Sequence, residues 1–90
     1  MSGDEIERLR AELTDVDLEL VDRVNRRLRL VAELKRAKDA LGIAFLDPAR
    51  EESMLRRLTE ENRGPLSDEG LRELYTEVLA LTKRELGRGR

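Results

Sequence analysis

The chain has no cysteine, no histidine and no tryptophan among its 90 residues, and only one tyrosine and one phenylalanine. Without cysteine it offers no disulfide, no thiolate nucleophile and no thiolate metal site. Without histidine it lacks the commonest general base and the commonest zinc ligand. It also lacks a hydrophobic run of transmembrane length, and its acidic start has no signal-peptide pattern, so we expect a cytoplasmic protein.

Charged residues are abundant instead, at 42% of the chain. Eighteen basic and 20 acidic residues give a formal net charge of −2, which provides no net positive field for nucleic acid. A mixture rich in Glu, Arg and Leu is typical of long amphipathic helices. Ninety residues suit one small domain, or an oligomer whose copies share a core.

The N-terminal part of the chain predicts one unusually long helix. Its pattern runs from Asp4 to Leu41 without proline or glycine, and Gly42 supplies a stop. Such a helix is roughly 55 Å long, whereas a compact domain of this size has a radius of gyration of about 12 Å. A second copy of the chain is therefore expected to cover the exposed stripe of this helix.

Two shorter helices are expected after the loop at residues 42–46. Asp47 caps the second helix, which runs from Pro48 to about Glu61. Ser67 caps the third helix, which we expect to end at Gly87.

No β pattern is present, so the fold class is all-α, with three helices in each copy of a homodimer. We expect one helical domain over residues 1–86. Residues 87–90 have the composition of a linker, which indicates a fused neighbour in a longer protein.

The inward stripe of the first helix carries charge at four positions. Steps of three and four residues from Ile6 pass through Arg10, Asp17, Arg27 and Lys38, among leucine and valine. Burying unpaired charge is costly, so three cations on a protected stripe predict a site for an anion. Arginine in particular suits bidentate binding of carboxylate or phosphate.

Each charged residue of the first helix also has a simpler explanation. Arg27 can pack its stem while its head reaches water, and Lys38 near the helix end favours the helix dipole. Arg10 and Asp17 can set the register of a dimer.

The candidate residues of the other helices have simpler explanations too. Asp47 can be only a helix cap, and Arg50 and Glu51 can be ordinary first-turn residues. Thr82 can be a core threonine that hydrogen-bonds back to its own helix. No catalytic triad, phosphate-binding loop or metal-ligand cluster is recognisable, so an enzyme of this sequence works by positioning and electrostatics.

From Ile6 to Leu86 the chain resembles the all-α chorismate mutases, the AroQ class or type II. The motifs that carry the resemblance are Leu9-Arg10, Arg26-Arg27, Lys35-Arg36-Ala37-Lys38 and, most specifically, Asp47-Pro48-Ala49-Arg50-Glu51, which is similar to the family's Asp-x-x-Arg-Glu motif. The chain is particularly similar to the mutase domains fused to DAHP synthase. The resemblance implies an intertwined homodimer that converts chorismate to prephenate without cofactor or metal, and a fused or partner DAHP synthase.

The resemblance also implies a role for each site residue. Arg10, donated by the other subunit, and Arg27 would hold the two substrate carboxylates, with Arg50 nearby. Lys38 would donate to the ether oxygen of the bond that breaks. The other expected contacts are Asp47 and Glu51 at the ring hydroxyl and Thr82 beside a carboxylate.

One position departs from the family pattern. Leu86 stands where the family commonly has Gln or Glu as a second donor to the ether oxygen. Leucine cannot donate, so either the adjacent Glu85 enters the site in its protonated form or Lys38 works alone.

Three other functions stay open at this point. An isochorismate pyruvate lyase has the same fold. A non-catalytic module could bind chorismate or prephenate to regulate a DAHP synthase. A purely structural helical dimer would bind neither ligand.

Overall fold

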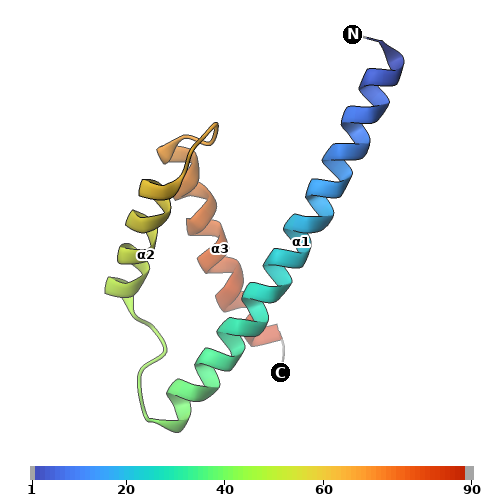
Figure 1. The fold of residues 1–90 in the computed structure, drawn as a ribbon. Coiled ribbons are helices and arrows are strands. Elements are labelled where there is room, and N and C mark those ends of the chain that lie inside the picture. The colour runs from blue at the N-terminus through green and yellow to red at the C-terminus, as the bar shows by residue number, and fades with distance from the viewer. Residues whose placement is uncertain (1, 89–90) are drawn as a thin grey trace.

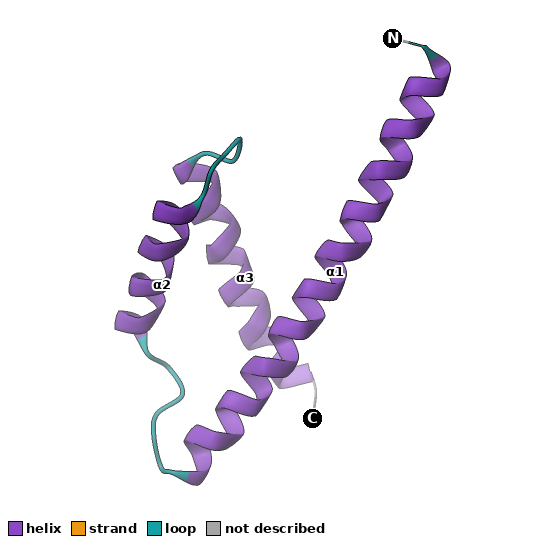
Figure 2. Ribbon diagram, in the orientation of Figure 1, coloured by secondary structure: helices purple, strands orange, loops and turns teal. Residues whose placement is uncertain are grey.

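The computed structural model describes residues 2–88, which form three helices: α1 (Gly3–Ala40), α2 (Pro48–Glu61) and α3 (Asp68–Arg88) (Figure 1). Within this range no residue is in a strand, as Figure 2 shows, so the predicted all-α fold class is confirmed. None of these three helices is long and apolar enough to cross a membrane.

Local hydrogen bonds fix both ends of α1. The Ser2 hydroxyl accepts from the backbone N–H of Glu5 at 3.2 Å and caps the helix, which therefore begins one residue before the predicted Asp4. At the other end, Gly42 adopts a left-handed φ of 68°. The N–H groups of Gly42 and Ile43 then donate to the carbonyls of Asp39 and Lys38, which is the Schellman pattern of a glycine stop.

Replacing Gly42 with alanine is expected to lower the free energy of unfolding by about 1–2 kcal/mol, the cost of a left-handed conformation for a residue with a Cβ. No atom lies within 4 Å of the position that this Cβ would take, so the cost is conformational rather than steric. Urea denaturation at fixed protein concentration measures the change.

Gly87→Ala is the matched control, since Gly87 lies inside α3 with the same open space around it. It is expected to leave stability unchanged or slightly raised. Equal effects of the two substitutions would contradict the glycine-stop explanation.

The other helix starts agree with the sequence prediction. The Asp47 carboxylate accepts from the N–H of Arg50 at 3.0 Å, and the Ser67 hydroxyl accepts from the N–H of Gly70 at 3.0 Å. Both residues thus satisfy a free donor in the first turn of their helix. The bounds of α2 are those predicted.

The end of α3 differs from the prediction. The helix continues through Gly87 to Arg88, so the first two residues of the predicted tail are helical, and residues 89–90 lie outside the described range. Arg88 pairs with Glu85 one turn earlier, an i,i+3 pair that supports a last helical turn.

The three helices do not enclose a core in one chain. Helix α3 packs against both α1 and α2, while the N-terminal half of α1 projects beyond them (Figure 1). The radius of gyration is 17.0 Å, against about 12 Å for a compact domain of this length. Only Leu71 and Thr82 among residues 2–88 are buried, each 6% exposed.

Candidate active site

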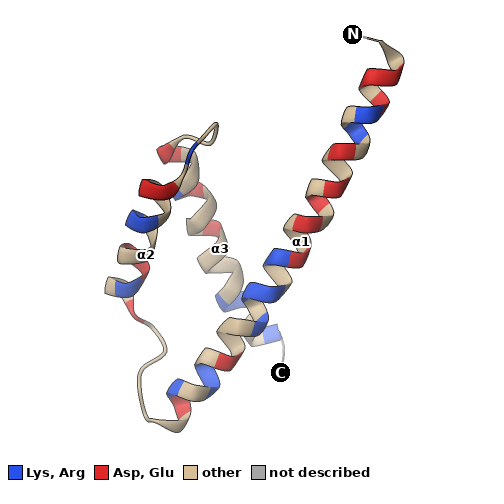
Figure 3. Ribbon diagram, in the orientation of Figure 1, with Lys and Arg blue, Asp and Glu red and all other residues tan. Residues whose placement is uncertain are grey.

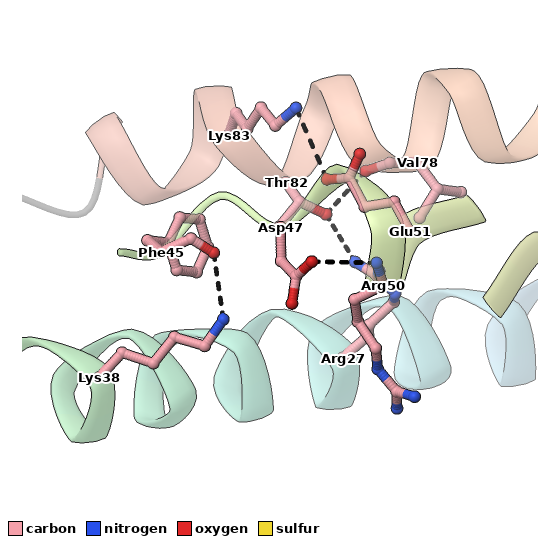
Figure 4. A network of polar contacts seen from close by, with 9 residues as sticks. All are labelled: Arg27, Lys38, Phe45, Asp47, Arg50, Glu51, Val78, Thr82 and Lys83. Atoms are coloured by element: carbon pink, nitrogen blue, oxygen red, sulfur yellow. Dashed lines mark hydrogen bonds and ion pairs between the residues drawn. The ribbon is translucent and has the colours of Figure 1, made fainter. Parts of the chain in front are cut away.

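A pocket of about 230 Å³ lies between the C-terminal half of α1, the loop before α2, the first turns of α2 and the middle of α3. Figure 4 shows the polar side chains that these elements contribute to it. Its lining consists of Arg27, Val31, Leu34, Lys38, Phe45, Leu46, Asp47, Arg50, Glu51, Met54, Leu79, Thr82 and Lys83. It therefore gathers six of the eight residues predicted for the site.

Arg27 is held in place by α3. Its Nη1 donates to the Thr82 hydroxyl at 2.8 Å, and that hydroxyl donates its proton to the Val78 carbonyl at 2.7 Å (Figure 4). Thr82 is thus the back-bonded core threonine considered above, and it also orients the guanidinium. This contact with α3 fixes the orientation of the guanidinium, and its other N–H groups remain able to donate to a ligand.

Lys38 is held by the loop that follows α1. Its ammonium donates to the Phe45 carbonyl at 3.2 Å, and the ammonium nitrogen lies 5.9 Å from the centre of the Phe45 ring (Figure 4). Both contacts attract a cation. The sharp stop at Gly42 turns the chain back, which brings Phe45 over the last turn of α1.

The first turn of α2 contributes charges of both signs. Asp47 caps the helix, and Arg50 and Glu51 lie one turn on. Glu51 forms an ion pair with Lys83 of α3, at 3.8 Å between Oε1 and Nζ (Figure 4). This pair joins α2 to α3 at the edge of the pocket.

The charge balance of the pocket favours an anionic ligand. Its charged lining comprises four cations, Arg27, Lys38, Arg50 and Lys83, and two carboxylates, Asp47 and Glu51. The rest of the lining is mostly apolar. Figure 3 shows that both signs of charge are otherwise spread along all three helices. A small dianion with a hydroxyl group would find cations for its acidic groups and carboxylates for the hydroxyl.

Two predicted site residues lie elsewhere. Arg10 is on the projecting half of α1, where it pairs with Glu7 at 2.9 Å with both side chains well exposed. Leu86 borders a separate hollow of about 420 Å³ between α1 and α3, together with Glu85. A single chain therefore does not bring Arg10, Glu85 or Leu86 into the pocket.

Comparison with known proteins decides the family. The sequence profile described as chorismate mutase type II matches residues 9–85. The chain belongs to the chorismate mutase type II family. The family that the sequence resembles is therefore confirmed.

Solved structures agree with the assignment to chorismate mutase type II. The chain is similar to chorismate mutase from Thermus thermophilus in two forms. Form II is 40% identical with a TM-score of 0.84, over 89% of this chain and 91% of that one. Form I is 41% identical with a TM-score of 0.84, over 87% and 98%.

A curated relative shows the domain in a longer protein. The chain is 29% identical over 83 residues to a bifunctional chorismate mutase/prephenate dehydratase from Stutzerimonas stutzeri. The match covers 87% of this chain and 23% of that protein, so the chain spans about a quarter of its length. The closer similarity to domains fused to DAHP synthase stays a prediction.

Sequence reasoning missed two polar contributors to the pocket, Phe45 and Lys83. Phe45 is the chain's only phenylalanine and stands in a short loop between two strong helix signals, which could have marked it. Lys83 directly follows Thr82 and lies four residues after Leu79 on the same helix face. The helical period could have placed Lys83 on the same face as Thr82, although not in the pocket itself.

Proposed function

We propose that this chain catalyses the rearrangement of chorismate to prephenate, an isomerisation by intramolecular transfer, in the pocket between α1, α2 and α3. The observation that carries the proposal is the convergence of Arg27, Lys38 and Arg50 with Asp47 and Glu51 in one pocket of a family member. Chorismate carries two carboxylates and a ring hydroxyl, which match this set of charges. No nucleophile or general base is needed for a unimolecular rearrangement.

Arg27 and Arg50 act chiefly by holding the substrate in its reactive, chair-like shape. The hydrogen bond from Arg27 to Thr82 supports this role, because a guanidinium already oriented by the protein loses less freedom on binding. Asp47 and Glu51 lie on the side of the ring hydroxyl, and one of the two carboxylates accepts its proton. Fixing a near-attack geometry in this way can account for a large part of the barrier reduction.

Lys38 acts on the transition state. Its ammonium donates to the ether oxygen, which gains negative charge as the C–O bond breaks. An interaction that strengthens as charge develops raises turnover rather than affinity. The Phe45 carbonyl and ring support this role by keeping the ammonium at the pocket before substrate arrives.

A second copy of the chain completes each site by contributing Arg10. Fourteen large hydrophobic residues of the described chain are exposed, and those on the projecting half of α1 include Leu13 at 62% and Leu20 at 59%. In a symmetric dimer that covers this face, the Arg10 of one copy would reach the pocket of the other copy. The exposed pair between Arg10 and Glu7 is weak, so Arg10 can exchange it for a substrate carboxylate.

The proposal also covers the protein partner and the cellular location of this domain. It includes a fused or partner DAHP synthase. It also includes a cytoplasmic location, with which the lack of cysteine is compatible. The curated relative supports fusion as a way in which such a domain is used, although its own second activity is a prephenate dehydratase.

The loss of chorismate absorbance in the ultraviolet tests the proposal. We expect saturable conversion, with acid treatment turning the product into phenylpyruvate. Isochorismate serves as the control substrate, and no salicylate fluorescence is expected from it. Salicylate formation would favour the lyase. Binding of chorismate or prephenate without turnover would favour the regulatory module.

A further inference from the structure

We propose that Lys83 binds the substrate directly, as the fourth cation of the pocket, by pairing with a carboxylate of the ligand from the α3 side. The inference rests on the proposed function, which supplies a dianionic substrate. It assigns a role to a residue that the other parts of the proposal do not use.

The orientation of α3 makes Lys83 the main candidate donor from this helix. Leu79, Thr82 and Lys83 line the pocket, whereas Glu85 and Leu86 border the separate hollow with Leu28 and Ala32. Thr82 has one hydroxyl proton, and that proton is donated to the Val78 carbonyl. Within the part of α3 that the structure describes, Lys83 is therefore the polar lining residue with donors left for a ligand.

The present partner of Lys83 leaves it able to bind an anion. Its ammonium lies 3.8 Å from the Glu51 carboxylate, with the two side chains 50% and 36% exposed. An ion pair at such exposure and distance is weak, and an ammonium has three N–H donors. Lys83 can thus keep contact with Glu51 while it donates to a ligand carboxylate. The ion pair holds the ammonium at the pocket and leaves N–H donors free for the ligand.

Lys83 and Lys38 belong to different walls of the pocket. Lys38 enters from α1 and the following loop, and Lys83 enters from α3 (Figure 4). The carboxylate charge of the substrate is the same in the ground state and the transition state. A cation that meets a carboxylate therefore changes substrate affinity, which shows in KM, more than turnover.

Lys83→Met tests the assignment, because it keeps an unbranched side chain of similar length and removes the charge. We expect KM for chorismate to rise about tenfold or more, as for a lost hydrogen bond to a charged group, with kcat within about threefold of wild type. Arg84→Met is the matched control: Arg84 is the next residue of α3, pairs with Glu77 and is absent from the pocket lining. It should leave both constants unchanged. A KM within twofold of wild type in Lys83→Met would overturn the proposal, whatever happens to kcat.

A second comparison separates direct binding from an effect through Glu51. Lys83→Met is made again in a Glu51→Gln background, where the ion pair no longer exists. Direct binding predicts a similar rise in KM in both backgrounds. No further rise in the double variant would show that Lys83 only orients Glu51, and would overturn direct binding.

Calorimetric titration with prephenate keeps this inference separate from the proposed function. If wild-type protein binds prephenate but does not convert chorismate, the proposed mutase activity fails. The effect of Lys83→Met on the dissociation constant still decides the role of Lys83. A dissociation constant equal to that of wild type overturns it, and a tenfold increase supports it.

Discussion

Lys38→Ala is expected to lower kcat for chorismate by about 100- to 1000-fold, the usual effect of removing one donor to an oxygen that gains charge in the transition state. KM should change far less, because the ether oxygen carries little charge in bound chorismate. Steady-state kinetics on folded, dimeric protein measure both constants. The size of the effect follows from the part-buried position of the ammonium, where a charge contact is screened less than on the surface.

Lys35→Ala is the control for Lys38. The Lys35 ammonium lies 6.0 Å from the same Phe45 ring but pairs with Asp39 at 2.9 Å, and Lys35 borders the separate hollow instead of the pocket. It should retain kcat within a few-fold of wild type. Wild-type kcat in Lys38→Ala, or equal losses in the two variants, would contradict the role given to Lys38.

Arg10→Ala and Arg27→Ala are each expected to lower kcat/KM by 100-fold or more, about 3 kcal/mol, because each removes a charged hydrogen-bond donor to a carboxylate. Mixing the two inactive homodimers should nevertheless restore activity. After subunit exchange half of the dimers are mixed, and each has one site with both arginines. Recovery should reach about a quarter of wild-type activity per chain, because a symmetric dimer has two equivalent sites.

A mixture of Arg27→Ala with Lys38→Ala provides the control for exchange. Both residues line the pocket of one chain, so every site in the mixed dimer lacks one of them and no recovery is expected. Exchange itself is verified by mass spectrometry of differently tagged copies. If the Arg10 mixture shows proven exchange without recovery, Arg10 is not contributed by the partner.

Local chemistry explains why the helices could be predicted well. A capping side chain, a proline at the first position and a glycine after the last turn each act within a few residues. Asp47, Pro48 and Gly42 therefore marked helix ends that the structure confirms. Arg27 and Lys38 are eleven residues apart on one helix face, which is why both line the pocket with Val31 and Leu34 between them.

Periodicity could not show which residues of α3 line the pocket and which line the neighbouring hollow. Leu79, Thr82, Lys83 and Leu86 are spaced by three and four residues and share one broad face. The way α3 crosses α1 sends the first three into the pocket and Leu86 into the neighbouring hollow. A crossing angle depends on packing between helices far apart in the sequence, which no local signal encodes.

Local sequence patterns also could not show how far Arg10 lies from the pocket of its own chain. Arg10 and Arg27 share the α1 stripe, but a straight helix holds them about 25 Å apart. Helix α1 is continuous between them, so the joint action proposed above requires Arg10 from a second copy. That dependence makes the mixed-dimer experiment informative in a way that single substitutions are not.

The proposed mutase activity is best tested by a proton NMR time course of chorismate with purified wild-type protein. We expect the chorismate signals to be replaced one-for-one by those of prephenate, with no added cofactor or metal and no pyruvate. Unchanged chorismate beside folded, dimeric protein, or release of pyruvate, would contradict it.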